Sequence, residues 1–398
     1  MTTTPAASVT KSALFPSVRP LLLAALLAWL APRTTRAENS VAYKFEDYRE
    51  SGGRIAVRTH GAFLDQGLGT AMRFKLSGIH DTITGATPTG QPAPAGSDQV
   101  GTTFIREEVR KAWSADLSRQ FGRLNLAFGG ANSRESDYVS NGWSLNTLTE
   151  FNQKNTTLLA GYAGTDDKIK VFYNPRLPRH RKHTNDAILG ATQLLDPRAS
   201  VTVNVTWGRM SGFLTDPYKL VQKNTEIFPG VFLPLTFAEN RPAYREKWIV
   251  FAGYHRSFPN RRAALEAGYR YYSDTFDVDA HTVDLAWFQR LGERFILRPS
   301  WRFYEQSAAR FYLYNLDRSP VTPLSSVPRP QGPFFSSDFR LSEMRTITYG
   351  LKAIWHVTDA FALDAKIERY EMRGLDGVTP ESAYVNARIL AVGAKFSW

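Results

Sequence analysis

The chain has 398 residues, of which 43% are hydrophobic, 22% are charged and 13% are aromatic, and it contains no cysteine. The lack of cysteine excludes thiol catalysis, disulfide scaffolds and every Cys-ligated zinc or iron–sulfur site. A polytopic helical membrane protein is also excluded, because each span needs about 20 mainly apolar residues and the sequence has a single long apolar run. The net charge of +12 leaves a nucleic-acid partner to be considered.

Residues 1–37 have the features of a secretory signal peptide. The segment 21–30 (LLLAALLAWL) is an apolar core too short to span a membrane, and Ala37 supplies a small residue for cleavage. The alternative is an uncleaved N-terminal anchor. The charged residues of the segment are all basic: Lys11, Arg19, Arg33 and Arg36. The mature chain therefore keeps 45 basic and 37 acidic residues, dispersed along its length, and we expect an exported protein without a nucleic-acid partner.

After Ala37 the dominant pattern is an alternation of apolar and polar residues over segments of about ten residues, which predicts strands with two unlike faces. The clearest case is 201–208, where Val201, Val203, Val205 and Trp207 alternate with smaller or polar residues. The same pattern occurs at 124–128, 143–151, 265–271, 283–287, 295–303 and 361–367. Counting such segments predicts about sixteen strands, with fourteen or eighteen as alternatives.

Short and long connections alternate between these strands. The short ones are expected at 118–122, 152–155, 195–198, 258–261, 291–292 and 358–360. The long ones are expected at 79–103, 133–142, 168–183, 211–245, 305–342 and 373–383. Outer-membrane barrels sort their loops in this way, with short periplasmic turns and long outer loops. We therefore predict an all-β, transmembrane, up-and-down antiparallel β-barrel as a single domain over 38–398, in the outer membrane of a Gram-negative bacterium.

The last strand gives a separate indication. Leu390, Val392 and Ala394 share one face with Phe396 and Trp398, and the chain ends on the aromatic residue. Outer-membrane barrels commonly end in this way, so we interpret Phe396 and Trp398 as a signal for the barrel assembly machinery. An ordinary amphipathic edge strand is the alternative. Aromatic residues at strand ends, such as Trp248 and Tyr349, are expected to contact outer-membrane lipid at its headgroup boundaries.

The segment Gly85-Ala86-Thr87-Pro88-Thr89-Gly90 follows Asp81 and precedes a proline-rich loop. In this context the chain resembles an uncharacterised family of proteobacterial outer-membrane proteins of unknown function, over most of the mature length. Thr84 stands where many members have serine. The resemblance implies a genomic neighbourhood with a small lipoprotein, a thioredoxin-like protein and a flavin transferase. It therefore implies a periplasmic lipoprotein or redox partner, but it defines no activity and no catalytic residue.

One segment is strongly basic and is expected to be an outer loop. Its members are Arg176, Arg179, His180, Arg181, Lys182 and His183. Such a loop would attract lipopolysaccharide phosphates or an anionic solute, and a solvated loop without a ligand is the alternative. The basic neighbours disfavour a metal ion at the two histidines. Asp274, Asp277 and Asp279 are interpreted as solvated turn acids, because they lack the glycine and bidentate glutamate of a calcium loop.

The sequence contains no hydrolase elbow, phosphate loop, dinucleotide fingerprint or metalloprotease motif, so we expect neither an enzyme nor a cofactor. If the apolar stripes face lipid, the opposite faces line a lumen with nearly balanced charges. The inward set has eight basic residues (Arg106, Arg110, Arg123, Arg270, Arg298, Arg302, Lys352 and Lys366) and seven acidic ones (Glu108, Asp116, Glu150, Glu266, Asp284, Asp364 and Glu368). The candidate pore residues among them are Arg106, Glu108, Arg110, Arg270, Asp284, Arg298, Arg302, Lys352, Asp364 and Lys366.

A barrel of about sixteen strands is wide enough for an aqueous channel unless loops fold inward. We expect a channel or transporter for small polar solutes, in which Arg298 and Arg302 form steps of a positive ladder. Neutralisation of that ladder by Asp284 is the alternative. The alternative function is a plugged structural or docking barrel that serves a periplasmic redox or flavinylation system. A barrel-embedded enzyme is the third hypothesis. The oligomeric state is left open.

Overall fold

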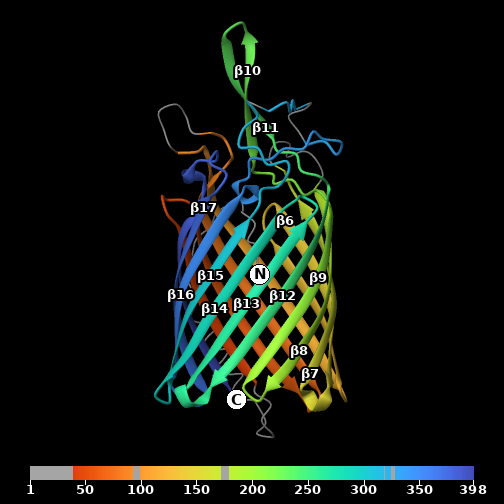
Figure 1. Cartoon of the computed structure of the whole chain (residues 1–398), viewed down its shortest axis with the longest axis vertical. Helices are drawn as coiled ribbons and strands as arrows, with labels where there is room; N and C mark the ends of the chain where they lie inside the picture. The colour runs from red at the N-terminus through yellow and green to blue at the C-terminus, as the bar shows by residue number, and fades with distance from the viewer. Residues whose placement is uncertain (1–38, 93–98, 172–178, 318, 324–327) are drawn as a thin grey trace.

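The computed structural model describes residues 39–92, 99–171, 179–317, 319–323 and 328–398. Its main feature is a single closed antiparallel barrel of sixteen strands, in the order β1-β18-β17-β16-β15-β14-β13-β12-β9-β8-β7-β6-β5-β4-β3-β2 (Figure 1). Apart from β9 and β12, which bracket a hairpin, sequential strands are neighbours, and β1 pairs with β18 to close the wall. The all-β fold and the sixteen barrel strands predicted from the alternation are confirmed.

The barrel strands are β1 (Ser40–Glu50), β2 (Ala56–Leu68), β3 (Met72–Pro88), β4 (Thr102–Phe121), β5 (Leu124–Arg134), β6 (Tyr138–Phe151), β7 (Thr156–Ile169), β8 (His180–Asp196), β9 (Ala199–Gly212), β12 (Tyr244–Phe258), β13 (Ala263–Asp274), β14 (Asp279–Leu291), β15 (Phe295–Gln306), β16 (Met344–His356), β17 (Phe361–Gly374) and β18 (Asn386–Ser397). In the connections that the structure describes there are four three-residue 3₁₀ helices: η1 (Asn152–Lys154), η2 (Pro259–Arg261), η3 (Phe339–Leu341) and η4 (Glu381–Ala383). Within the described ranges, no helix has the length and apolar character needed to cross a membrane.

The two ends of the barrel differ in their connections. At one end, which we call the turn end, β1 begins and β18 ends, and the backbones of Asn39 and Trp398 exchange hydrogen bonds of 3.1 and 3.0 Å. The connections at the other end, the loop end, include the long segments 213–243 and 307–343 (Figure 1). The sorting of connections by length is thus a property of the fold.

Three of the expected long loops are shorter than the sequence pattern suggested. β3 continues to Pro88, β5 and β6 leave only residues 135–137 between them, and β8 begins at His180. The physical reason is that strands extend past the apolar band. Beyond that band both faces of a strand are polar, so the apolar–polar alternation disappears although the strand continues.

The long segment between β9 and β12 contains a feature that the alternation did not predict. β10 (Leu220–Phe228) and β11 (Val231–Ala238) pair into a separate two-stranded hairpin that projects beyond the loop end (Figure 1). Phe228 and Phe232 near its tip are 67% and 58% exposed.

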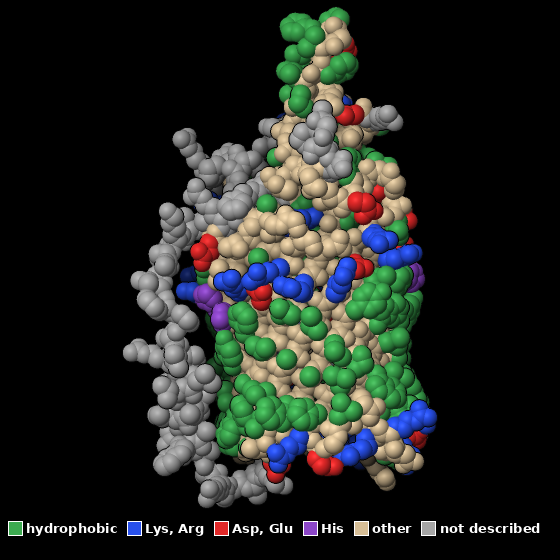
Figure 2. Space-filling view, turned by 90° about the vertical axis from the view of Figure 1, so that its left-hand side faces the viewer, with side chains coloured by type: hydrophobic (Ala, Val, Ile, Leu, Met, Phe, Trp, Pro, Cys, Tyr) green, Lys and Arg blue, Asp and Glu red, His purple; other side chains and the backbone are tan. Residues whose placement is uncertain are grey.

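The outer surface of the barrel carries a broad apolar band (Figure 2). Val203 and Leu285 are 44% and 41% exposed within it, and Trp248 and Tyr349 are 52% and 50% exposed. Apolar side chains on the outside and polar ones on the inside are the reverse of a soluble barrel. This arrangement is that of an outer-membrane barrel.

Candidate functional site

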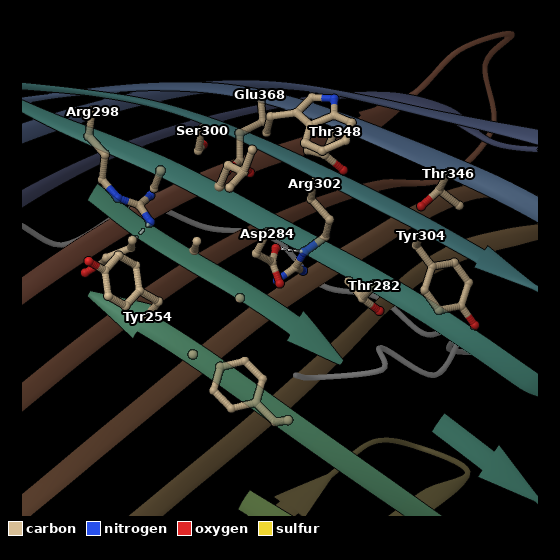
Figure 3. A pocket seen from close by; sticks show the side chains of 18 of the residues that line it. Tyr254, Thr282, Asp284, Arg298, Ser300, Arg302, Tyr304, Thr346, Thr348 and Glu368 are labelled. Carbon is tan, nitrogen blue, oxygen red and sulfur yellow. Dashed lines mark hydrogen bonds and ion pairs between the residues drawn. The ribbon is translucent and has the colours of Figure 1, made fainter. Parts of the chain in front are cut away.

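The inside of the barrel contains a cavity of about 830 Å³ with both polar and apolar lining residues, most of them from β12 to β17. Figure 3 shows its polar side chains, and these come from neighbouring strands on one side of the wall. Members with ionisable side chains include Glu266, Asp284, Arg298, Arg302 and Glu368. Alternation places them there, because their strand neighbours Leu285 and Tyr269 are exposed on the opposite face.

The two arginines of the expected ladder are paired with carboxylates. Arg302 Nε lies 2.5 Å from Asp284 Oδ1, and the two face each other across β14 and β15 (Figure 3). Arg298 lies 3.6 Å from Glu266. The side chains of Arg302 and Asp284 are 46% and 36% exposed, so the charges are solvated as well as paired. The ladder is therefore close to neutral, as the alternative interpretation of the sequence held.

Other candidate lumen residues are paired in the same way. Lys352 lies 3.0 Å from Asp364, and Lys366 lies 2.9 Å from Glu368 and 3.5 Å from Glu46. Arg270 also points inward, and its guanidinium carbon lies 5.9 Å from the centroid of the Phe251 ring.

The remaining candidates lie on β4 near the loop end. Arg110 lies 2.5 Å from the buried carboxylate of Asp81. Glu108 is 2% exposed and accepts hydrogen bonds from the backbone and hydroxyl of Ser136 at 2.7 and 3.0 Å. It holds the 135–137 turn rather than facing open lumen. The side chain of Arg106 is outside the described part of the chain.

A second cavity, of about 620 Å³, lies where the wall meets the loops. Its wall residues include Asp81 and Arg110, and its loop residues include Asp216, Lys219 and Arg340. Both cavities are bordered by Tyr370 and Ile389, so they are adjacent sections of one lumen. The segments 213–219, 239–243 and 335–342 form the loop-end boundary, and we call them the cap.

An alternating chain of charges joins the two long loops within the cap. Arg241 lies 2.6 Å from Glu239 and 2.8 Å from Asp338. Arg340 contacts Asp338 at 2.6 Å and also pairs with Asp216. The sequence of contacts is therefore Glu239–Arg241–Asp338–Arg340–Asp216. Glu239, Asp338 and Arg241 are 0%, 1% and 11% exposed, so the inner part of the chain is buried. Arg340 at its outer part is 41% exposed and reaches water, although its partner Asp338 does not.

The cap carboxylates differ in their electrostatics. Burial is the largest influence on both Glu239 and Asp338, and it favours the neutral form. At Asp338 the nearby Arg340, Lys219 and Arg241 outweigh burial and lower the pKa. Glu239 has Arg241 as its main basic neighbour, and burial raises its pKa to about 7. Two carboxylates thus share Arg241, and the one with fewer cations is the more readily protonated.

The cap also contacts distant parts of the barrel rim. Lys219 Nζ donates to the Pro88 carbonyl, and directly after the cap segment the N–H of Leu220, the first residue of β10, donates to the Thr89 carbonyl at 2.8 Å. The hydroxyl of Tyr218 donates to Asp137, between β5 and β6. The residues that accept these hydrogen bonds belong to the β3–β4 and β5–β6 connections. The cap itself is part of the β9–β12 and β15–β16 connections, so it links well-separated sections of the rim.

Two glycines of the Gly85–Gly90 segment are required by this arrangement. Gly85 has φ +115° at a register shift between β3 and β4, and a side chain there would collide with the Arg54 carbonyl. Gly90 has φ +94°, and a side chain there would collide with Ser337 and Leu220. Only glycine adopts a positive φ without strain, and only glycine lacks the Cβ atom that would collide with these neighbours. The two glycines therefore allow the β3–β4 connection to pack against the cap.

Sequence reasoning missed the cap network. A signal was present, since both long loops contain an acid two residues before an arginine: Glu239 before Arg241, and Asp338 before Arg340. The reason it was missed is that the contacts that join the two loops, Arg241–Asp338 and Arg340–Asp216, connect residues 97 and 124 positions apart in sequence.

The strongly basic segment was expected to be a loop, but its last four residues lie in a strand. His180 to His183 begin β8, where alternation sends Arg181 and His183 to the exposed outer face. Lys182 turns inward to Asp167 at 2.9 Å, and His180 stacks on Phe213 with ring centroids 4.3 Å apart. The two histidines therefore do not share a face. Arg179 donates to the Ser136 carbonyl at 3.0 Å, and Arg176 lies outside the described residues.

The aspartates near the β13–β14 turn have protein partners. Asp274 accepts from Arg245 at 2.7 Å and from the Phe276 N–H at 2.7 Å, and Asp279 accepts from Tyr271 at 2.8 Å. In the described part of the chain, no three His, Asp or Glu side chains gather into a possible metal site. At the other end of the barrel, Phe396 and Trp398 stack with ring centroids 5.9 Å apart.

Solved structures with a similar fold include outer-membrane proteins. The siderophore receptor PirA from Acinetobacter baumannii has 11% identity and a TM-score of 0.41, over 86% of this chain and 54% of the receptor. OmpT of Vibrio cholerae has 9% identity and a TM-score of 0.43, over 92% of this chain and 99% of that one. A structure described as a bacterial polysaccharide outer membrane secretin has 9% identity and a TM-score of 0.48, over 92% and 100%.

The chain spans 54% of PirA from Acinetobacter baumannii and 61% of the ferric enterobactin receptor PfeA. No curated protein matches the sequence. A family model does match, and its range begins after the Gly85–Gly90 segment, so this match is independent of that segment. The model covers residues 94–381, and the chain belongs to the family described as protein of unknown function DUF3570.

Proposed function

We propose that this protein is an outer-membrane channel for small polar solutes whose passage is controlled by the cap. The observation that carries the proposal is the contrast between the two cavities. The larger is enclosed by a wall with an apolar outer band and is lined by ion pairs that are partly exposed, whereas the smaller is bounded by loops that are joined through the buried carboxylates Glu239 and Asp338.

The membrane-spanning section suits polar solutes. Its paired charges provide hydrogen-bond donors and acceptors on the wall, and their partial exposure shows that water reaches them. Because the charges on the wall nearly balance, they produce an electric field across the lumen but exclude neither cations nor anions strongly. We therefore expect weak ion selectivity.

The cap suits a gate more than a permanent plug. Its charge chain links segment 239–241 to segment 338–340, and breaking any of these links removes a cationic partner from a buried carboxylate. Such an arrangement has two discrete states, paired or separated, which is what a gate requires.

The proposal is tested by liposome swelling with the refolded mature chain. Uncharged sugars of increasing size and small organic anions and cations provide the solutes. We expect slow swelling for the wild type, and faster swelling for Arg340→Gln, which removes the link between Asp338 and Asp216. Arg302→Gln, which removes a solvated pair in the wall, is the matched control and should leave the cap closed.

The second candidate function is a plugged barrel that docks a partner, such as the periplasmic lipoprotein or redox protein implied by the family resemblance. It is favoured by the burial of Glu239 and Asp338, which makes the cap costly to open. In that case neither the wild type nor Arg340→Gln would swell liposomes, although both would be folded barrels.

A further inference from the structure

A row of basic side chains crosses the outer face of the barrel, between the apolar band and the loop end (Figure 2). Part of the row lies on the three adjacent strands that close the barrel. Arg388 of β18 is directly opposite Arg49 of β1 on one side and Arg369 of β17 on the other. All three side chains are exposed.

Such an arrangement is unfavourable without an anion. Residues directly opposite on neighbouring antiparallel strands have Cβ atoms about 5 Å apart, and like charges in these positions destabilise a sheet. Acidic neighbours compensate in part, since Arg49 pairs with Asp47 at 2.8 Å and Arg369 with Glu371 at 2.6 Å. Asp47 is shared with Arg58 at 3.7 Å. Among the described residues, no ion pair involves Arg388, so the centre of the row has no acidic partner.

The three arginines also border a depression in the surface. An open groove of about 500 Å³ is lined by Arg49, Arg369 and Arg388 together with Ile367 and Asn386. Glu50 and Glu368 also border it, and their carboxylates are paired with Arg54 and Lys366. Immediately toward the membrane, on the same outward faces, Ile367, Leu390 and Val392 are 50%, 37% and 53% exposed. The groove therefore has guanidinium groups at its upper edge and an apolar wall below.

We propose that this groove binds the phosphate groups of a phosphorylated glycolipid of the outer leaflet, the lipid A part of lipopolysaccharide. Guanidinium groups bind phosphate through charge-assisted, often bidentate hydrogen bonds. The acyl chains of the same molecule would lie along Ile367, Leu390 and Val392. The continuity of cationic and apolar surfaces favours a lipid over free phosphate, which would use the arginines alone.

The location differs from the one expected from the sequence. The basic segment near His180 was expected to attract lipopolysaccharide, but Lys182 is engaged with Asp167 inside the wall and His180 stacks on Phe213. Arg49 lies on the other side of the barrel closure from Arg369 and Arg388 and more than 300 positions before them in sequence, so no local pattern marks the whole site.

The proposal is tested by native mass spectrometry of the purified mature chain with bisphosphorylated lipid A. We expect the variant R369Q/R388Q to bind lipid A about tenfold more weakly, because two charge-assisted donors are lost. R261Q/R290Q removes the same charge from exposed positions at the turn end and should bind like the wild type. Lipid A without phosphates should bind weakly to all three proteins.

Two further measurements serve as controls for this test. Heat-modifiable migration on gels shows that each variant is a folded barrel, and R369K/R388K, which keeps the charges but loses the bidentate geometry, should bind with intermediate affinity. Equal binding by R369Q/R388Q and wild type, or by phosphorylated and dephosphorylated lipid A, would overturn the proposal. Displacement of lipid A by an equal concentration of inorganic phosphate would overturn the assignment to a lipid. None of these results depends on whether the lumen conducts.

Discussion

The membrane-spanning wall and the cap use charged residues in opposite ways. In the wall, Arg302 and Asp284 are paired but remain 46% and 36% exposed to the water of the lumen. In the cap, Glu239 and Asp338 are almost fully buried around Arg241. Exposed pairs contribute little to stability, whereas removing one partner of a buried pair is costly. The wall can therefore change its charges without losing its fold, and the cap cannot.

The largest effect is expected at the centre of the cap. Asp338→Asn leaves both Arg241 and Arg340 without their shared carboxylate. Loss of one partner from a buried pair costs roughly 3 to 5 kcal/mol, so we expect the cap to separate and its loops to become cleavable by trypsin. Asp284→Asn in the wall is the control, with an expected cost of about 0 to 1 kcal/mol. Equal protease resistance of the two variants would contradict the comparison.

The next effect concerns the two faces of the wall. Val203→Arg and Leu285→Arg place a charge in the apolar band and should each lower the free energy of unfolding by about 2 to 4 kcal/mol. Thr202→Arg, whose side chain points to the lumen, should cost much less. Thr282, which also faces inward, is a poorer control because it is only 3% exposed. Urea unfolding in lipid vesicles measures these differences. Equal costs for Val203→Arg and Thr202→Arg would show that the lumen is packed rather than wet.

A pH dependence should distinguish the cap from the wall. Burial raises the pKa of Glu239 to about 7 from its ordinary value of 4.5, with Arg241, Asp216 and Asp338 as its charged neighbours. A raised pKa means that the neutral carboxyl stabilises the cap, fully below about 4.5 and progressively less as the pH rises to about 7 and above. We expect faster solute passage at pH 8 than at pH 5.

Glu239→Gln provides the control for this experiment, because an amide does not titrate. The variant should show the same passage rate at both pH values. The pKa of Asp338 is lowered, so its protonation affects the cap only at far lower pH. A pH dependence that persists unchanged in Glu239→Gln would assign the effect to another group.

The smallest effect is expected from the arginines of the wall. Arg298→Glu with Arg302→Glu places new acids beside Glu266 and Asp284. The reversal potential in a salt gradient should shift toward cation preference, by an amount that moderate salt reduces, because the groups are solvated. An unchanged reversal potential with a large loss of heat stability would mean that the ion pairs of Arg298 and Arg302 only stabilise the barrel wall.

The wall could be predicted because its information is local. Val203 and Leu285 lie on the outer face and Thr202 on the inner face as a direct result of strand alternation, which is visible within ten residues of sequence. The pairing of Arg302 with Asp284 was also accessible, because both lie on the inward faces of consecutive strands. Strand ends were misjudged at Pro88 and His180, since alternation disappears where both faces are wet.

The cap could not be predicted in the same way. Arg241 and Asp338 are brought together only when two long loops fold toward each other over the lumen, and neither loop has an apolar periodicity that reveals its path. The requirement for glycine at Gly90 likewise appears only when Ser337 and Leu220 are seen beside it. These contacts depend on the closed barrel, which sets the distances between the loop anchors.

Single-channel recording in planar bilayers tests the central claim most directly, because it reports passage through the lumen and the state of the cap together. We predict brief, infrequent openings for the wild type and long openings of the same unit conductance for Arg340→Gln, since the variant changes the cap and leaves the pore wall intact. Absence of conductance in both proteins, with both shown to be folded barrels, would contradict the account and favour a plugged barrel.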